Sequence, residues 1–361
     1  MRVVIAGGGT GGHVYPGLAV AEALASLAPE AEIVFAGGDG LERRVVPRAG
    51  WPFRRILSRP WTRSGLRRIP GAALTAAGLA QSVVWLSRWR PRVVLATGGY
   101  AALPVGLAAV LLGIPLVVQE QNVVPGAANR LLARWARAVS VPHGAAGLGP
   151  RTVVTGVPVR SAALDGDRDR GRRRFRLEEG RTTVLILGGS QGARSLNAAA
   201  VRMAPALAGS PVQILHQTGE AHYAWVQRER DGLEASPPYT CVPYIEHVAD
   251  SYACADLVVC RAGAGTLAEA TAHGLPVVAV PYPHAASAHQ EANARVLEEA
   301  GAAVVIADRD LSPRRLADTV ADLCARPQVL QAMARASRSL GRPDAAREVA
   351  GLVLQAAGGR P

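Results

Sequence analysis

The sequence has no lysine, so all 40 of its basic side chains are arginines, an absence that we attribute to genome composition rather than to mechanism. Cysteine is also scarce. The four cysteines form no CxxC pair and have no zinc-ligand spacing. We therefore expect Cys241, Cys254, Cys260 and Cys324 to be buried thiols in a reducing compartment, which excludes a disulfide framework and a zinc motif.

Acidic residues are scarce in the first part of the chain. Residues 1–159 contain 17 arginines and six acidic residues, a net charge of +11, whereas residues 160–361 are almost neutral at +1. Such an asymmetry indicates that the first part meets a polyanion, either nucleic acid or an anionic membrane. The N-terminus lacks the pattern of a secretory signal, because Arg2–Ala6 begins a strand at once.

Two long segments lack charge altogether. Residues 93–119 are divided by Pro104, Gly113 and Pro115 into a strand, a helix and a strand, each too short to cross about 30 Å of hydrocarbon. Residues 69–87 are the better candidate for a membrane contact. We expect them to form a helix that lies either on the sheet of its domain or on a membrane surface.

A glycine-rich loop follows a strand near the start of each half. Gly7, Gly9 and Gly12 fit GxGxxG, but only Asp39 is available as the acid that dinucleotide binding requires. The loop therefore favours a phosphate or diphosphate at a helix start. The strand at residues 183–187 and the loop that follows it repeat this arrangement.

The alternation of strands and helices predicts an α/β protein with two doubly wound Rossmann-like domains facing a cleft. We expect the domains at 1–159 and 160–340, with a C-terminal helix at about 341–358 that can pack back on the first. The charged segment 161–181 is typical of a linker or an exposed excursion.

Residues 256–293 are the most informative stretch. A strand at 257–260 leads through a glycine turn into a helix that carries Glu269 one turn from its start. Helix amides attract an anion, and a carboxylate there can accept hydrogen bonds from two neighbouring hydroxyls, as on a ribose. His289 and Gln290 are suited to sugar hydroxyls. The alternative is a strand-turn-helix that needs glycine only for close packing.

Polar residues also follow other strands, at 98–100 and 120–122, and the carboxyl ends of parallel strands form the ligand crevice of such folds. His13, at the start of the first helix, can serve as a general base. It can equally be a histidine that caps or packs that helix.

The motifs occur in the order found in the MurG family, the lipid I N-acetylglucosaminyltransferases of bacterial peptidoglycan synthesis, and the chain resembles this family over nearly its whole length. The motifs are GGGTGGHVYPGLAVAEAL from Gly7, TGGYAALP from Thr97, EQN from Glu120, GVPVR from Gly156, GGSQGARSLN from Gly188 and RAGAGTLAEATAHGLPVVAVP from Arg261. Together they are far more specific than any one alone.

The resemblance implies a GT-B type glycosyltransferase that is inverting, independent of metal and without a cofactor. It would move GlcNAc from UDP-GlcNAc to the 4-hydroxyl of MurNAc in lipid I, undecaprenyl-pyrophosphoryl-MurNAc-pentapeptide, to give lipid II. It would be a peripheral protein on the cytoplasmic face of the cell membrane, where it would bind the anionic membrane surface. No nucleic acid would be involved.

The resemblance also implies the roles of particular residues. Donor contacts are expected at Thr10, Gly11, Gly12, Asn122, Arg160, Ser190, Ile245, Arg261, Gly263, Ala264, Thr266, Glu269, His289 and Gln290. Acceptor contacts are expected at Gly8, Gly9, Gly98, Gly99 and Tyr100. His13 would be the general base. Ile245 would meet the uracil, and Ser190 with the 263–266 turn would take the diphosphate.

One position departs from the family, in which many members have histidine before EQN, whereas this chain has Gln119. Other functions share some of these features. A UDP-GlcNAc epimerase has the same fold and donor, and a glycosyltransferase for another lipid is a closer alternative. A nucleic-acid-binding protein would explain the charge but not the two glycine loops.

Overall fold

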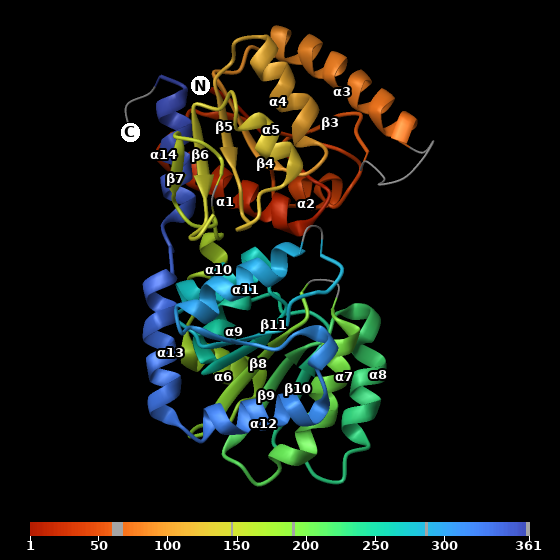
Figure 1. Ribbon diagram of the computed structural model, residues 1–361, viewed down its shortest axis with the longest axis vertical. Coiled ribbons are helices and arrows are strands. Elements are labelled where there is room, and N and C mark those ends of the chain that lie inside the picture. Colours follow the sequence, from red (N-terminus) through yellow and green to blue (C-terminus); the bar gives the residue numbers. More distant parts are fainter. Residues whose placement is uncertain (60–67, 146, 190–191, 286–287, 359–361) are drawn as a thin grey trace. The chain divides into compact units, whose positions relative to one another are not determined.

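The structure, a computed structural model, describes residues 1–59, 68–145, 147–189, 192–285 and 288–358. The chain forms two compact units (Figure 1). The first comprises Met1–Arg160 together with Pro343–Pro361, and the second comprises Ser161–Arg342. The chain therefore passes from one unit to the other at residues 160–161 and again at 342–343.

The first unit is built on a parallel sheet that has seven strands among the described residues, in the order β3-β2-β1-β4-β5-β6-β7. These strands are β1 (Arg2–Gly7), β2 (Glu32–Gly37), β3 (Phe53–Arg55), β4 (Val93–Gly98), β5 (Leu116–Gln119), β6 (Ala138–Val141) and β7 (Thr152–Val154). Val3 pairs with Ile33 on one side and with Val93 on the other. The direction of strand order reverses at β1 and β4, where such sheets bind their ligands.

Helices cover both faces of this sheet. They are α1 (Gly11–Leu27), α2 (Glu42–Arg48), α3 (Arg68–Trp89), α4 (Ala102–Leu111), α5 (Ala127–Leu132) and α14 (Ala345–Ala356). Val3 and Ile5 pack with α1 and α14, while Val4 and Ala6 pack with residues of α3, α4 and α5. Because both faces are buried, the central strands β1, β4 and β5 are mostly apolar. The last helix of the chain packs on α1 (Figure 1).

The second unit repeats the plan with a parallel sheet that has six strands in the part of the chain described, in the order β10-β9-β8-β11-β12-β13. Its strands are β8 (Thr182–Leu187), β9 (Val212–Gln217), β10 (Tyr239–Val242), β11 (Leu257–Cys260), β12 (Val277–Ala279) and β13 (Ala303–Val305). Its helices are α6 (Arg168–Phe175), α7 (Arg194–Met203), α8 (Glu220–Asp231), α9 (Val248–Cys254), α10 (Ala264–Ala272), α11 (His289–Glu299), α12 (Pro313–Cys324) and α13 (Pro327–Leu340). The predicted pair of doubly wound Rossmann-like domains is confirmed.

The prediction of a linker or exposed excursion at 161–181 is wrong. This segment contains α6, which packs closely on α9: a Cβ added at Gly171 would lie 2.4 Å from the Asp250 carbonyl oxygen. The Asp250 carboxylate is buried and pairs with Arg170 at 2.7 Å and with Arg174 at 3.3 Å. The arginines therefore bind an aspartate far away in sequence, which the local composition does not reveal.

Three of the cysteines are buried free thiols, and Cys324 is partly exposed. Burial raises the pKa of the Cys260 thiol to about 12, so it is an inert core group. Of the helices in the described parts of the chain, none combines the length and the apolar character needed to cross a membrane.

Candidate functional site

The first glycine loop lies between the end of β1 and the start of α1, in contact with its neighbours. A Cβ added at Gly7 would lie 2.0 Å from Oγ1 of Thr97, and one added at Gly8 would lie 2.4 Å from the carboxyl of Glu42. Gly9 has a φ of 91°, which favours glycine. The Thr97 hydroxyl donates to the carbonyl of His13 at 2.8 Å and so fixes the start of α1 to β4.

Glu42 is the main residue of this region that sequence reasoning missed. Its side chain is 1% exposed. Oε2 accepts from the Gly9 amide at 2.8 Å, and Oε1 accepts from the amides of Gly38 at 2.9 Å and Gly40 at 3.3 Å. The carboxylate therefore joins the loop after β1 to the loop after β2. The available signal was a lone acid in the first turn of a helix, just after a glycine-rich strand end.

This arrangement changes what the loop can offer a ligand. The Gly9 amide donates a hydrogen bond to the Glu42 carboxylate, and the Gly8 amide donates to the Gly98 carbonyl at 3.3 Å. Gly11 and Gly12 lie in the first turn of α1, where amides have no acceptor within the helix. An anion at this loop would therefore bind the α1 amides rather than those of Gly8 and Gly9.

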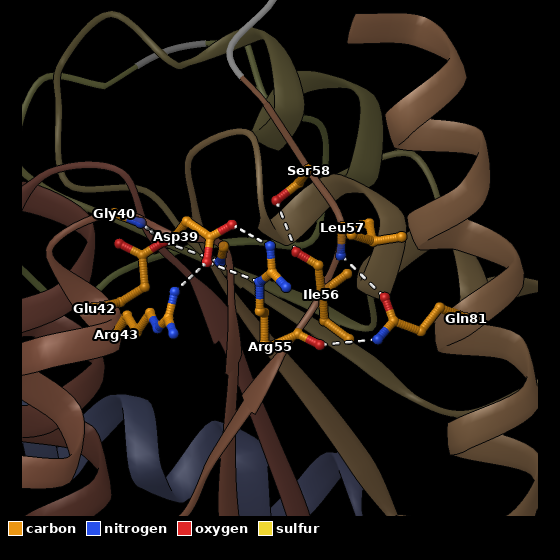
Figure 2. A network of polar contacts seen from close by, with 10 residues as sticks. Asp39, Gly40, Glu42, Arg43, Arg55, Ile56, Leu57, Ser58 and Gln81 are labelled. Atoms are coloured by element: carbon orange, nitrogen blue, oxygen red, sulfur yellow. Dashed lines mark hydrogen bonds and ion pairs between the residues drawn. The ribbon is translucent and has the colours of Figure 1, made fainter. Parts of the chain in front are cut away.

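Asp39, the acid considered for dinucleotide binding, forms ion pairs with two arginines. Arg55 binds both of its oxygens, at 2.7 and 2.6 Å, and Arg43 donates to it at 3.0 Å (Figure 2). The hydrogen bond from Arg55 lowers the pKa of Asp39. The carboxylate thus organises the entry to α2.

Tyr100 and the two glycines before it form the opposite side of the loop. A Cβ added at Gly9 would lie 2.7 Å from the Tyr100 ring, so the ring covers the loop. Burial, and next the charge of Glu42, raise the pKa of Tyr100 and keep its hydroxyl neutral. Gly98 and Gly99 have φ values of 102° and 80°, and a Cβ at Gly98 would lie 2.8 Å from the His13 ring.

His13 therefore lies against Gly98 and Gly99, partly exposed, in the first turn of α1. Its Nδ1 is 2.9 Å from Oγ1 of Thr10. When Nδ1–H donates to this hydroxyl, the lone pair of the imidazole is on Nε2, the arrangement that a general base needs. Predicted donor, acceptor and catalytic residues thus meet here: Thr10, His13 and the 98–99 glycines.

The segment after β5 is held by Glu120, which is 1% exposed. Oε1 accepts from the Asn122 amide at 2.8 Å, and Oε2 accepts from the amides of Gly126 and of the Asn129 side chain, both at 2.9 Å. Glu120 is thus a structural residue that positions Asn122. Gln119 is fully buried. Arg160 pairs with Glu22 on α1 at 2.6 Å, apart from the glycine loop.

In the second unit, Arg261 at the end of β11 is 9% exposed and largely neutralised. Its Nη1 pairs with Asp308 at 2.6 Å and its Nη2 donates to Oγ of Ser195 at 2.6 Å. The Nε is buried with no partner among the described residues. The charge of Arg261 is therefore compensated by Asp308, and Nε is its one nitrogen without a hydrogen-bond partner among the described residues.

The turn after Arg261 is open. Gly263 is the N-cap of α10, and Ala264 and Thr266 lie in its first turn. A Cβ added at Gly263 or Gly265 would meet no atom of the described residues within 4 Å. The alternative that these glycines serve close packing is therefore not supported, and residues 263–266 at the start of the helix are partly exposed.

Glu269 lies on α10, one turn further along. The hydroxyl of Tyr252, which is 1% exposed, donates to its Oε2 at 2.8 Å. Burial of the carboxyl raises the pKa of Glu269 to about 7, an effect that the hydrogen bond from Tyr252 opposes.

Gln217, at the end of β9, is a second residue that the sequence did not reveal. Its Oε1 accepts from the Ile245 amide at 3.2 Å, and its Nε2 donates to the Gly189 carbonyl at 3.3 Å. It therefore ties the segment of the expected uracil contact to the second glycine loop. Ser190 of that loop lies outside the described residues.

The start of α11 carries the remaining predicted donor contacts. His289 and Gln290 are the first residues of α11. Oε1 of Gln290 accepts from the amide of Tyr282 at 2.9 Å, and the Tyr282 ring lies 5.7 Å from the Arg261 guanidinium. Gln290 is thus linked through Tyr282 to the end of β11.

Comparison with known proteins agrees with this arrangement. Residues 3–141 match the glycosyltransferase family 28 N-terminal domain, and residues 183–349 match the C-terminal domain of the same family. A relative in Moorella thermoacetica, UDP-N-acetylglucosamine--N-acetylmuramyl-(pentapeptide) pyrophosphoryl-undecaprenol N-acetylglucosamine transferase, is 44% identical over 98% of this chain and 99% of its own. A protein of the same name in Desulforudis audaxviator is also 44% identical, over 99% of each chain.

The chain belongs to the MurG family, within glycosyltransferase family 28. The crystal structure of MurG from Acinetobacter baumannii is 30% identical, with a TM-score of 0.81 over 98% of this chain and 99% of that one. The UDP-GlcNAc 2-epimerase of Neisseria meningitidis has a TM-score of 0.66 at 14% identity, which shows only a common fold. The family matches cover both units with their glycine loops, and the chain is a glycosyltransferase.

Proposed function

We propose that this protein transfers GlcNAc from UDP-GlcNAc to the 4-hydroxyl of MurNAc in lipid I, giving lipid II, with inversion and without a metal. The observation that carries this proposal is the 44% identity, over nearly the full length of both chains, with transferases named for that reaction. The second unit, with Glu269 and the open start of α10, would bind the donor. The first unit, with His13 and Tyr100, would bind the acceptor.

The residues fit the steps of such a transfer. The oxygen of the MurNAc 4-hydroxyl attacks the anomeric carbon of GlcNAc from the face opposite UDP, and His13 takes its proton. The bond from that carbon to the UDP oxygen breaks, and UDP leaves with the electron pair. Amides of the first turn of α10, together with Arg261 at the end of β11, would stabilise the diphosphate in place of a metal.

The test is to supply UDP-GlcNAc with lipid I or a short-chain analogue and to identify the product by mass spectrometry. We expect one added GlcNAc on the lipid and one UDP released for each transfer. A UDP-sugar changed only in configuration, with the lipid unchanged, would favour an epimerase and contradict the proposal.

We further propose that the first unit docks on the cytoplasmic leaflet, because its lipid substrate lies in a membrane. Helix α3, which has no charged residue between Arg68 and Arg88, lies beside α4 (Figure 1), and Val84 on α3 is 49% exposed. Leu111, at the end of α4, is 68% exposed. Arg88 and Arg90 are also exposed, near the end of α3. Exposed apolar residues with arginines beside them suit a membrane interface.

The contacts of α3 refine this proposal. Leu79, Trp85 and Trp89 are partly buried and pack against the core, so only part of each side chain is open to a membrane. Gln81 accepts from the Leu57 amide at 3.0 Å and donates to the Arg55 carbonyl at 2.9 Å, which ties α3 to the chain after β3 (Figure 2). The helix is therefore held as a fixed surface.

Vesicle sedimentation tests the docking. We expect binding to anionic vesicles that salt weakens, and that Arg88→Ser with Arg90→Ser, or Val84→Ser with Leu111→Ser, reduces. Each arginine near an anionic surface contributes about 1 kcal/mol. Val154→Ser is the matched control, since Val154 is 45% exposed on β7 of the same unit. Equal binding to neutral vesicles, or an equal loss with the control, would contradict the docking.

A further inference from the structure

Tyr252 brings a buried hydroxyl to the carboxylate that is proposed to bind the donor's ribose. It lies on α9, is 1% exposed, and donates to Oε2 of Glu269 on α10 over 2.8 Å. A carboxylate can otherwise rotate about its last torsion, and a bond to one oxygen fixes the plane of the group. Oε1 is then the oxygen presented to neighbouring hydroxyls.

The ring of Tyr252 is itself held in place. It stacks on His273 with ring centroids 5.2 Å apart and an angle of 23° between the planes. The Nε2 of His273 donates to the carbonyl of Ala163 at 2.8 Å, which fixes the tautomer and the ring. A chain of contacts therefore joins Ala163, His273, Tyr252 and Glu269. Ala163 lies near the start of the second unit, which begins at Ser161.

We propose that Tyr252, supported by His273, is a positioning residue for donor recognition: it orients the Glu269 carboxylate toward the ribose. This rests on the proposed function, in which Glu269 accepts the ribose hydroxyls. Tyr252 touches neither substrate and acts only through Glu269.

The charged form matters because both oxygens of a carboxylate only accept hydrogen bonds, whereas a carboxylic acid has an O–H donor and fewer acceptor positions for two hydroxyls. The pKa of Glu269 is about 7 because burial raises it, and the Tyr252 bond lowers it. The pKa of Cys260, on β11 beside it, is raised to about 12, so this thiol stays neutral. Donor affinity should therefore rise with pH through about 7.

Other charged groups near α10 lie at its ends or on neighbouring helices. The Arg338 side chain of α13 lies against Gly274, just past the end of α10. His289 and Glu291 lie in the first turn of α11, which packs on α10. Arg338, His289 and Glu291 are unchanged in the variants below. Any contribution of these residues to the pH profile is therefore the same in wild type and in every variant.

The experiment measures UDP-GlcNAc binding to the full chain by calorimetry between pH 5.5 and 8.5, a range in which the diphosphate diester of the donor does not titrate. Tyr252→Phe keeps the stacked ring and loses the hydroxyl. We expect about 5- to 20-fold weaker binding at pH 7, with the midpoint of the pH profile moved to higher pH. At pH 8.5 the difference from wild type should narrow.

Two variants complete the design. His273→Ala removes the supporting ring. It should also move the midpoint of the pH profile of binding to higher pH, but by less than Tyr252→Phe does. Tyr239→Phe is the matched control, since its hydroxyl bonds to buried His216 at 2.8 Å in the same unit without touching Glu269. Thermal unfolding of each variant shows whether it folds. If Tyr252→Phe does not fold, His273→Ala decides the result.

The outcomes separate two claims. In one outcome, wild-type affinity for UDP-GlcNAc depends on pH and on Glu269, but the pH profiles of Tyr252→Phe and His273→Ala coincide with the wild-type profile. This result would overturn the positioning role alone. An equal loss at every pH would show a merely structural role and also overturn it. Wild-type protein that does not bind UDP-GlcNAc, or binds it equally well as Glu269→Gln, would overturn the donor site together with the positioning role.

Discussion

Oε2 of Glu42 accepts a hydrogen bond from the amide of Gly9 at 2.8 Å, in the middle of the first glycine loop. The other oxygen of the same carboxylate accepts from the loop after β2, at Gly38 and Gly40. An internal carboxylate thus satisfies amides that glycine loops commonly offer to a phosphate. It fixes the shape of the loop without a ligand and leaves anion binding to the first turn of α1.

Glu42→Gln tests this relationship. The nitrogen of glutamine cannot accept a hydrogen bond, so at least one amide of the two loops would be left buried and unpaired. We expect the free energy of unfolding to fall by about 1–3 kcal/mol, as measured in urea. The transfer rate should fall as well, because Gly9 and Tyr100 pack on each other.

The matched control for this change is Glu32→Gln. Glu32 lies on β2 of the same unit, where its exposed carboxylate pairs with Arg2 at 3.0 Å. Exposed pairs contribute about 0–1 kcal/mol, so this variant should be close to wild type in stability and rate. If both variants lost the same stability, Glu42 would have no special role in the loop.

His13→Ala is expected to lower kcat by about 10²–10⁴-fold, the usual contribution of a general base, with little change in donor binding. Thr10 provides a finer test, because its hydroxyl lies 2.9 Å from Nδ1 of His13. Thr10→Val removes the hydroxyl and should lower kcat, whereas Thr10→Ser keeps it and should not. A near-normal kcat for His13→Ala in steady-state kinetics would contradict its role as general base and would favour a packing role instead.

Glu269→Gln is expected to have opposite effects on binding and on stability. Loss of a charged acceptor to two hydroxyls should weaken UDP-GlcNAc by about 10- to 100-fold. The carboxyl has a pKa of about 7 in the fold against an ordinary 4.5, so its contribution to stability is present below pH 4.5 and is lost as pH rises through 7. The ligand-free variant should therefore exceed wild type at pH 8 by about 1–3 kcal/mol.

Urea unfolding at pH 5 and pH 8 measures this second effect. At pH 5 the wild-type carboxyl is mostly protonated in the fold, so the two proteins should differ much less. A variant that is less stable than wild type at pH 8 would contradict the raised pKa of the Glu269 carboxyl.

The sequence was sufficient to predict the two doubly wound domains, because their strands are continuous apolar runs that end in glycine loops. It was also sufficient to place His13 in the first turn of α1 and Glu269 on the helix after β11. It could not reveal Glu42, Gln217 or Tyr252, because each acts on a backbone or side chain brought close only by the sheet order. For the same reason it misjudged segment 161–181, whose arginines pair with Asp250 from another helix.

The most direct test of the account is the release of UDP from UDP-GlcNAc, measured with and without lipid I in the presence of EDTA. We expect UDP only when the lipid acceptor is present, at a rate that the chelator leaves unchanged, because fixed donors such as the α10 amides replace a metal. Release of UDP or conversion of the sugar without the acceptor would contradict a lipid glycosyltransferase. Activity abolished by EDTA and restored by Mg²⁺ would contradict the proposed mechanism.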